Sequence, residues 1–416
     1  MARLIEIAEA LSLIRHHVWQ PCESERVPLL ESEGRILAED VASDVDSPPH
    51  DKSLVDGFAV CSQDFVNQTA VTLEIIEDVH AGQVPVRAVR SGETIRIMTG
   101  APLPVGADAV VMVEQAKLSN DGRFVTLHAV PQPNQNIMRR QTVMQANEIV
   151  LRQGSRLNAA AIGLLAEVGR SHVTVFRRPC VAVLPTGDEL VPCHQTPGAG
   201  MIRNSNGPML QSMLAAAGAV AVDLGIGKDS IDDLRRKIAA GLQSDVLILS
   251  GGVSAGVKDL VPQVLSELNV QPVFHKVNIK PGKPLWFGFQ ERKDQGGTET
   301  SIRHRTFVLG LPGNPVSSLV CFMVFVKPLL SLLQGITEPK ELSTEVGHLV
   351  GDHSHEDDRP TFKPAIVDWT SNERPVEVLQ WHGSSDLKTI AHANALAFFR
   401  STKHYAANSP VDLLRL

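Results

Sequence analysis

The chain has 416 residues, a formal net charge of −7 and a single tyrosine. It is too long for one ordinary domain, and its charge and scarce aromatic side chains argue against nucleic-acid binding by base stacking. Five cysteines without a CxxC pair predict reduced thiols, and the charged first segment lacks the pattern of a signal peptide, so we expect a cytoplasmic protein. The longest apolar run, residues 316–326, is too short to span a bilayer and predicts a buried helix, so we expect no membrane contact.

The N-terminal part of the chain predicts a small β domain inserted into a mixed one. Apolar residues recur at helical spacing from Leu4 to Val18, which indicates an amphipathic helix. Between residues 58 and 130, short β-branched runs alternate with Gly, Pro and Asp turns, as in an all-β domain. We therefore expect an inserted β domain at 44–134, and a mixed linker and dimerisation domain made of 1–43 together with 135–175.

The next segment, residues 176–333, predicts a doubly wound α/β domain with a parallel sheet. Three apolar runs at 181–184, 246–250 and 306–309 alternate with helical patterns, and each run ends in a loop of small residues. Beyond a linker, residues 334–416 show short strands and turns that predict a small β-barrel. The histidines and acidic residues at 348–358 follow no metal-ligand spacing and are predicted to form a solvated loop.

The loops that follow the three central strands predict a pocket for a phosphate-bearing anion. Ligands of parallel sheets bind outside the carboxyl ends of the strands. Gly251 and Gly252 would let the backbone approach such a ligand with free N–H groups, and residues 280–284 (KPGKP) add two cations on a stiff turn. Carboxylates near the strand ends, at Asp188, Glu189, Asp229 and Asp259, would suit a divalent cation, although helix capping is the alternative and suits Asp229 well.

Six short motifs in one order resemble the MoeA family of molybdopterin molybdotransferases, which is related to the E-domain of gephyrin. They are DGFA at 56–59, MTGAP at 98–102, PTGDEL at 185–190, SGGVSAG at 250–256, KPGKP at 280–284 and LPGNP at 311–315. The resemblance runs from the first helix to the final barrel. It implies four domains and a homodimer, and an enzyme that inserts molybdate into adenylated molybdopterin and releases AMP with the help of Mg²⁺ or another divalent cation.

The resemblance also implies roles for individual residues. It implies catalytic roles for Asp259, Glu189, Asp56 and Thr99, and metal binding by Asp259 and Asp229. It implies that the pterin and pyrophosphate are held by Thr186, Gly187, Asp188, Ser250, Gly251, Gly252, Ser254, Pro312, Gly313, Asn314 and Pro315. Molybdate would be held by Lys280, Lys283, Lys276, Arg359 and Ser384. An enzyme that adenylylates molybdopterin is the functional partner that this chemistry implies.

The chain departs from the family pattern at a few positions. After NIMRR at 136–140 the family usually has Gly-Glu-Asp, whereas this chain has Gln141, Thr142 and Val143, so a carboxylate is missing. Lys52 replaces the usual asparagine, and RPTF at 359–362 lacks an acidic residue and a second arginine that are typical there. Two alternatives therefore stay open, a molybdopterin adenylyltransferase-like enzyme and a divergent non-catalytic molybdopterin-binding or scaffold protein.

Overall fold

The computed structural model describes residues 4–18, 20–252, 260–292, 304–336, 344–400 and 403–416. The chain divides into two compact units. The first unit comprises Met1–Val27, Gly34–Ala38 and Thr174–Leu416, and the second comprises Pro28–Glu33 and Glu39–Val173.

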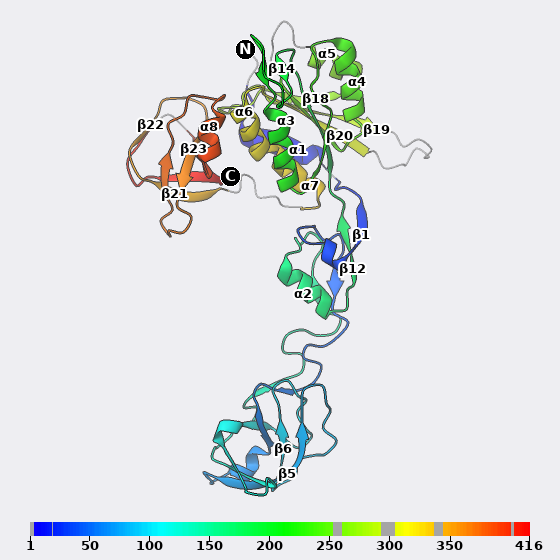
Figure 1. Cartoon of the computed structure of the whole chain (residues 1–416), viewed down its shortest axis with the longest axis vertical. Coiled ribbons are helices and arrows are strands. Elements are labelled where there is room, and N and C mark those ends of the chain that lie inside the picture. The colour runs from blue at the N-terminus through cyan, green and yellow to red at the C-terminus, as the bar shows by residue number, and fades with distance from the viewer. Residues whose placement is uncertain (1–3, 19, 253–259, 293–303, 337–343, 401–402) are drawn as a thin grey trace. The chain divides into compact units, whose positions relative to one another are not determined.

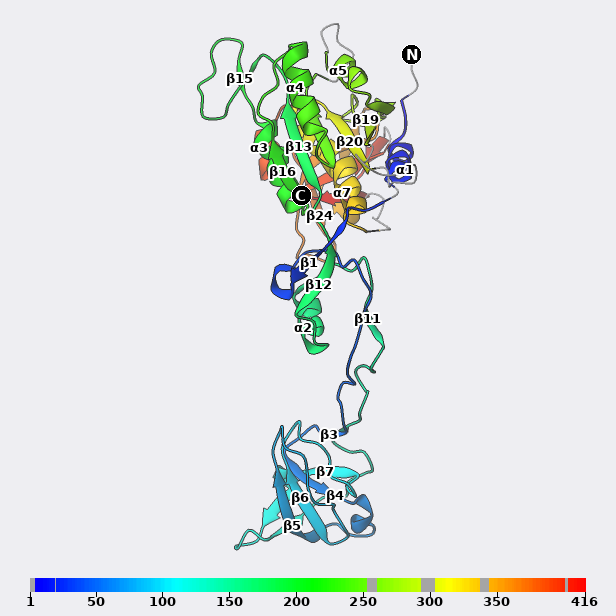
Figure 2. The same ribbon diagram turned by 90° about the vertical axis from the view of Figure 1, so that its right-hand side faces the viewer.

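A six-stranded mixed sheet forms the centre of the first unit (Figures 1 and 2). Its strands, in spatial order, are β16 (Val220–Asp223), β13 (Cys180–Pro185), β17 (Val246–Ser250), β20 (His304–Leu311), β19 (Trp286–Arg292) and β18 (Gln271–His275). The first four are parallel, which confirms the predicted parallel sheet, while β19 and β18 extend it as antiparallel strands that the sequence analysis did not identify. The polar segment 291–305 is typical of an exposed loop, but its ends at Glu291 and Arg305 belong to β19 and β20, and residues 293–303 lie outside the described residues.

Helices cover both faces of this sheet, because alternate strand residues point to opposite sides. Ala182 and Leu184 pack in one core with α4 (Ile231–Gly241) and α5 (Val261–Glu267). Val181 and Val183 belong to a larger core on the other face. That core contains residues of α1 (Ile7–His17), α3 (Asn206–Ala216), α6 (Pro315–Cys321), the π-helical turn Phe322–Val326 and α7 (Lys327–Leu333).

The continuous helix Pro315–Leu333 is long and apolar enough to cross a membrane, by length and composition alone. However, 67% of its most apolar window is buried inside the protein. Val320, Phe325 and Leu329 are all completely buried in the larger core. The prediction of a buried helix is therefore confirmed.

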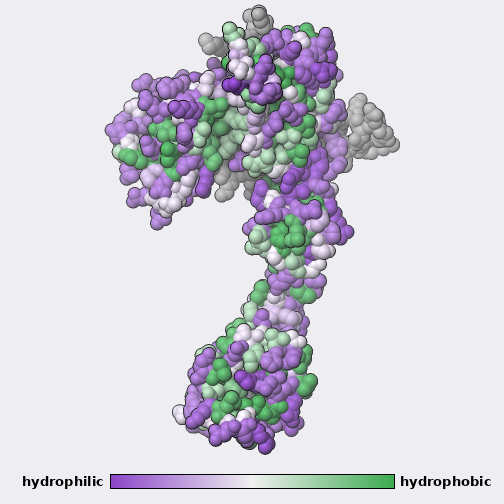
Figure 3. All heavy atoms as spheres, in the orientation of Figure 1, coloured by the Kyte–Doolittle hydropathy of each residue, from purple (hydrophilic) through white to green (hydrophobic). Residues whose placement is uncertain are grey.

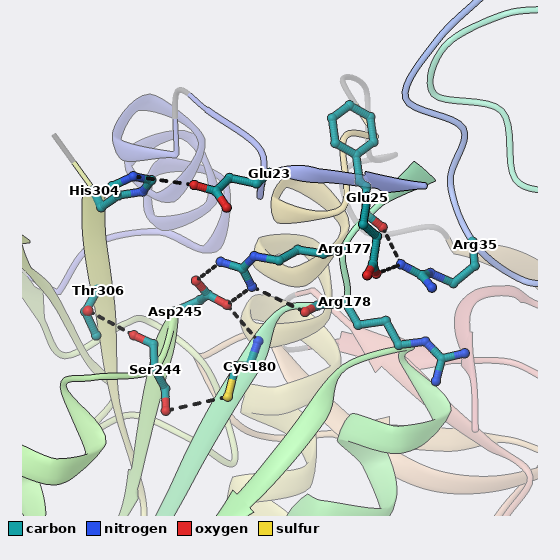
Figure 4. Close-up of polar contacts among 11 residues, drawn as sticks. Glu23, Glu25, Arg35, Arg177, Arg178, Cys180, Ser244, Asp245, His304 and Thr306 are labelled. Carbon is teal, nitrogen blue, oxygen red and sulfur yellow. Dashed lines mark hydrogen bonds and ion pairs between the residues drawn. The ribbon is translucent and has the colours of Figure 1, made fainter. Parts of the chain in front are cut away.

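An ion pair ties together the amino ends of the central strands (Figure 4). Asp245, which precedes β17, accepts hydrogen bonds from Arg177 Nη1 at 2.6 Å and Nη2 at 2.7 Å, and from the backbone N of Cys180 at 2.7 Å. The backbone O of Asp245 accepts from the N of Phe307 at 2.9 Å, so the same residue contacts β13 and β20. A small cavity of about 50 Å³ lies beside this pair, and His304 is among its lining residues.

The C-terminal part of the first unit is a closed five-stranded barrel, as the sequence predicts. Its strands are β21 (Glu345–Leu349), β24 (Pro375–Val378), β23 (Thr361–Val367), β25 (Ala395–Phe399) and β27 (Pro410–Arg415). The short helix α8 (Leu387–His392) and the two-stranded ribbon of β22 (His353–His355) and β26 (Lys403–Tyr405) accompany it. Two further pairs lie in this unit or at its border: β14 (Leu190–Val191) with β15 (Ile202–Arg203), and β1 (Ser24–Pro28) with β12 (His172–Phe176).

The second unit contains the predicted all-β region. Its six-stranded sheet has the order β7 (Ala109–Met112), β4 (Gly57–Val60), β6 (Glu93–Ile97), β5 (Val71–Val79), β9 (Phe124–Leu127) and β8 (Ala116–Leu118). Two short ribbons pair β10 (Ile137–Met138) with β3 (Lys52–Ser53), and β11 (Ile149–Leu151) with β2 (Val41–Ala42). The helix α2 (Ala159–Glu167) is apolar along its length, yet Leu165 is its one fully buried residue, so apolar atoms are visible there in Figure 3.

Polar side chains cap two of the helices. Asn158 caps α2 by accepting a hydrogen bond from Ala161 N, and Ser230 caps α4 by accepting one from Asp233 N. The helix α3 begins at Asn206, and Ser205 before it makes no capping hydrogen bond with its side chain. The four-domain boundaries stay a prediction. The helix α1, assigned to the linker domain in that prediction, packs into the core of the first unit.

Candidate active site

A cavity of about 710 Å³ lies at the carboxyl ends of the parallel strands in the first unit. The predicted residues that line it are Thr186, Gly187, Glu189, Asp229, Ser250, Gly251, Gly252, Pro312, Gly313, Asn314 and Pro315. Pro284, from the turn with the two lysines, and Ser385 and Leu387, from the C-terminal part, also line it. Asp188 lines a neighbouring cavity of about 760 Å³. Ser254 and Asp259 lie outside the described residues.

The loop after β17 needs glycine because its backbone passes very close to Thr186. Gly251 and Gly252 have φ angles of +97° and +64°, in the left-handed region. A Cβ on Gly251 would lie 2.6 Å from the backbone O of Thr186, and one on Gly252 would lie 2.9 Å from Thr186 Oγ1. The expectation of a free N–H is wrong for Gly251, whose N donates to the O of Leu311 at 3.1 Å.

Asn206 lines the cavity and joins two of its segments, although it was not among the predicted site residues. Its Nδ2 donates to Ser250 Oγ and to the backbone O of Gly313, each at 2.7 Å. This one amide therefore links the loops that follow β17 and β20. The polar run from Arg203 to Asn206, which also lines the cavity, was the signal available in the sequence.

Glu189 and Asp229, two of the predicted acidic residues, line the cavity. The Oδ1 of Asp188 accepts a hydrogen bond from the backbone N of Asp229 at 3.1 Å. Oxygen donors of this kind suit Mg²⁺. Within the described ranges, no group of three or more His, Cys, Asp or Glu residues is placed to hold a metal ion.

The backbone of Lys280 is joined to the barrel. Its N donates to the O of Pro360, and its O accepts from the N of Phe362, both at 2.8 Å, so the turn forms a parallel bridge with β23. The Lys280 ammonium forms a short ion pair with Asp357, and Arg359 Nε lies 3.3 Å from the other oxygen of the same carboxylate. The structure thus brings together two of the predicted molybdate-binding residues, with an aspartate that sequence analysis placed in a solvated loop.

The remaining predicted molybdate-binding residues lie at different places around this turn. Lys283 is exposed and Lys276 is half-buried, and the backbone O of Lys283 accepts from Val277 N at 3.0 Å. Ser384 is linked to the cavity loop, because its Oγ accepts from Asn314 Nδ2 at 2.8 Å.

The predicted solvated loop with the histidines contains instead the short strand β22, in which His355 is buried. His355 is only 2% exposed, and the His353 ring stacks on Phe399 with 4.5 Å between the ring centroids. Burial, followed by the charge of Lys363, lowers the pKa of His353 to about 4. Burial also lowers the pKa of Lys363, and the positive charge of Lys280 adds to this effect. A cluster of basic side chains therefore lies beside the Lys280–Asp357 pair.

The predicted catalytic residues Asp56 and Thr99 form a pair in the second unit. Asp56 Oδ1 accepts hydrogen bonds from the N and the Oγ1 of Thr99, both at 2.7 Å. The bond from the backbone N, then the one from the hydroxyl, lower the pKa of the Asp56 carboxyl below its ordinary value. This exposed carboxylate is thus held ionised by two donors.

The position of the missing family carboxylate is exposed in the second unit. Val143 is 59% exposed, and its N donates to the O of Ser47 at 2.9 Å. The two arginines that precede this position in the motif at 136–140 already have partners, because Arg139 pairs with Asp51 and Arg140 pairs with Asp46.

Comparison with known proteins identifies the family. Residues 5–169 match the MoeA N-terminal region (domain I and II), and residues 182–332 match the probable molybdopterin binding domain. A molybdopterin molybdenumtransferase of Haemophilus influenzae is 37% identical over 333 residues, which cover 80% of this chain and 78% of that protein. One from Staphylococcus epidermidis is 32% identical over 421 residues, which cover 99% of this chain and 95% of the other.

Comparison with solved structures identifies the same family. The crystal structure of the molybdopterin biosynthesis moeA protein from Pyrococcus horikoshii OT3 matches with a TM-score of 0.83 and 26% identity, over 100% of both chains. A second structure of the moea protein from that genus matches with a TM-score of 0.79 and 28% identity, over 99% of both. With its motifs, its cavity and its near-complete match to these relatives, the chain belongs to the MoeA family.

Proposed function

We propose that the protein is a molybdopterin molybdenumtransferase of molybdenum cofactor biosynthesis, which inserts molybdate into adenylated molybdopterin and releases AMP. The observation that carries the proposal is the match to relatives of that name over almost the whole chain, together with a cavity at the strand ends that the predicted substrate-binding loops line. A volume of about 710 Å³ falls in the range of small-molecule sites.

In this proposal, the polar residues of the strand-end loops, the cations and the carboxylates have different roles. Thr186, Ser250 and Asn314, on the strand-end loops, would orient the pterin and pyrophosphate by hydrogen bonds. Lys280 and Arg359 would hold the dianionic molybdate, since both carry a charge that favours an oxyanion. Glu189 would orient water for cleavage of the phosphoanhydride, and Asp56 would contribute a carboxylate that stays ionised.

A divalent cation is part of the proposal. Glu189 and Asp229 would supply two oxygen ligands, and Asp259 would have to supply a third. When bound, such an ion would neutralise charge on the pyrophosphate. Magnesium is usually held by one or two carboxylates and completes its coordination with water and substrate phosphates, so two carboxylates on the cavity wall fit this role.

A homodimer is also proposed. The apolar helix α2 leaves Ile162 and Leu164 only half-buried within its own unit, and such a face suits contact with a second copy. A cytoplasmic location and functional coupling to the enzyme that adenylylates molybdopterin belong to the same proposal, because adenylated molybdopterin must be supplied. Light scattering during size-exclusion chromatography tests the dimer.

The decisive experiment is incubation of the purified protein with adenylated molybdopterin, molybdate and Mg²⁺. Formation of the molybdenum cofactor together with AMP supports the proposal. Adenylation of free molybdopterin from ATP would instead reveal an adenylyltransferase, and tight binding without turnover would reveal a scaffold. Omission of Mg²⁺ in a parallel reaction tests the cation.

A further inference from the structure

Asp357 joins two cations that come from different parts of the first unit. Its Oδ2 accepts from Lys280 Nζ, 77 positions earlier in the chain, in a short ion pair. Its Oδ1 accepts from both the backbone N of Arg359, at 3.1 Å, and Arg359 Nε, at 3.3 Å. One carboxylate therefore fixes the ends of both side chains.

The exposed fractions show which partner faces solvent. The side chain of Asp357 is 16% exposed, that of Arg359 is 29% exposed, and that of Lys280 is 43% exposed. The carboxylate is thus the most enclosed member of the group, and the ammonium is the most accessible. An anion arriving from solvent meets the cations, while the carboxylate supports them from the enclosed side.

The backbone of both cations is fixed, but their side chains need help. Lys280 is hydrogen-bonded to Pro360 and Phe362, which ties its backbone to the residues that directly follow Arg359. A lysine side chain nevertheless has four rotatable bonds and loses much rotamer freedom when it is held in place. Repulsion from Arg359 and from Lys363, whose pKa is itself lowered by burial and by Lys280, would drive the Lys280 ammonium outward.

We infer that Asp357 is a positioning residue, which holds the Lys280 ammonium and the Arg359 guanidinium together as one oxyanion site. This inference rests on the proposed function, which assigns molybdate to these two cations. The carboxylate offsets the mutual repulsion of the cations and orders both side chains before the anion arrives. Binding then costs less conformational entropy, which is the general benefit of preorganisation.

The test is the affinity for molybdate alone, measured by isothermal titration calorimetry at fixed ionic strength. Asp357→Asn should weaken binding about five- to tenfold, because two long side chains must be ordered anew at each binding event. The matched control is Asp358→Asn, which removes the same charge one residue away, where no ion pair is found among the described residues. It should leave affinity unchanged or slightly stronger, since it only makes the region more positive.

Whether Asp357→Asn weakens or strengthens molybdate binding tests the role of Asp357. If the carboxylate only competed with molybdate for the two cations, or only repelled it by its negative charge, the Asp357→Asn variant would bind molybdate more tightly. That result would overturn the inference. Unchanged affinity would overturn it as well. Asp357→Glu provides a second variant if the asparagine variant does not fold. It keeps the charge but displaces the carboxylate by one methylene, and a smaller loss of affinity is expected.

Failure of the proposed function would look different. If the unaltered protein does not bind molybdate, or if Lys280→Ala binds it as well as the unaltered protein does, the oxyanion site itself is wrongly assigned. If Lys280→Ala weakens binding while Asp357→Asn does not, only the role of Asp357 fails. In enzyme assays, loss of positioning should raise the KM for molybdate and leave the KM for adenylated molybdopterin unchanged.

Discussion

Thr99 donates two hydrogen bonds to one carboxylate oxygen of Asp56, one from its backbone N and one from its hydroxyl, and both are 2.7 Å long. Hydrogen bonds to the charged form favour ionisation. Because the pKa of Asp56 is lowered, the stabilising contact is fully present above the ordinary carboxyl pKa and is lost only as the pH falls through the lower folded-state value.

Thr99→Val should therefore raise the pKa of Asp56 toward its ordinary value, because one of the two donors is removed. Carboxyl NMR titration measures this change. Asp121, whose pKa is lowered by Ser119 and by the backbone N of Arg123, provides an internal control that should not move. An unchanged titration of Asp56 would show that the backbone N of Thr99 alone holds the charge.

Lys280→Ala and Lys283→Ala should impair the use of molybdate more than the binding of the pterin. Each lost charge-assisted contact is expected to cost about 1.5–3 kcal/mol, roughly ten- to a hundredfold in affinity. The measurement is the molybdate dependence of cofactor formation. Lys327→Ala, at an exposed position of α7, is the matched control. Equal molybdate dependence in all four proteins would remove the lysines from the site.

Asp245→Asn should destabilise the first unit by about 2–3 kcal/mol, because it weakens a partly buried ion pair and its hydrogen bonds. The carboxylate accepts two hydrogen bonds from Arg177 and one from the N of Cys180, at the point where the central strands begin (Figure 4). Thermal unfolding followed by circular dichroism gives the change. Asp232→Asn, whose side chain is 96% exposed, should be nearly neutral, and an equal loss in both would argue against the ion pair.

The thiols should differ strongly in their reactivity with iodoacetamide at pH 8. Cys193 is exposed and should react first, whereas Cys22 and Cys321 are buried. Burial, with a smaller contribution from Asp245, raises the pKa of Cys22 to about 12, and burial also raises that of Cys321, so neither forms much of the reactive thiolate. Peptide mass spectrometry reads the order of labelling. Labelling in guanidinium chloride, where all sites are accessible, is the control, and early labelling of Cys22 would contradict the predicted burial.

Val143→Asp should fold normally and change stability by less than about 0.5 kcal/mol, since the side chain is 59% exposed. We expect a modest gain in turnover if this position lacks a working carboxylate. The gain should be limited, because Arg139 and Arg140 already pair with Asp51 and Asp46. Val143→Asn, which is polar but uncharged, separates the effect of charge from that of polarity. A native enzyme of ordinary rate that the aspartate leaves unaltered would show that no carboxylate is needed here.

Much of the architecture could be predicted because it depends on local patterns. Buried parallel strands are continuous apolar runs, so 181–184, 246–250 and 306–309 were recognisable one at a time. The loops after them meet at one edge of the sheet by the geometry of parallel strands, which is why most of the predicted substrate-binding residues line a single cavity. The strands β18 and β19 were missed, since their pairing is antiparallel and their runs are interrupted by Pro272 and Gly288.

The alternation of elements, the strand-end loops and the ordered motifs were therefore legible in the amino-acid sequence, because each depends on residues within a few positions of one another. In contrast, the folded chain was needed to reveal that the amide of Asn206 links Ser250 to Gly313, and that Asp357 holds Lys280 and Arg359. These contacts join residues up to 107 positions apart. Hydrogen-bond partners at such separations are set by the packing of whole elements, which fixes positions in space that no local spacing of polar residues specifies.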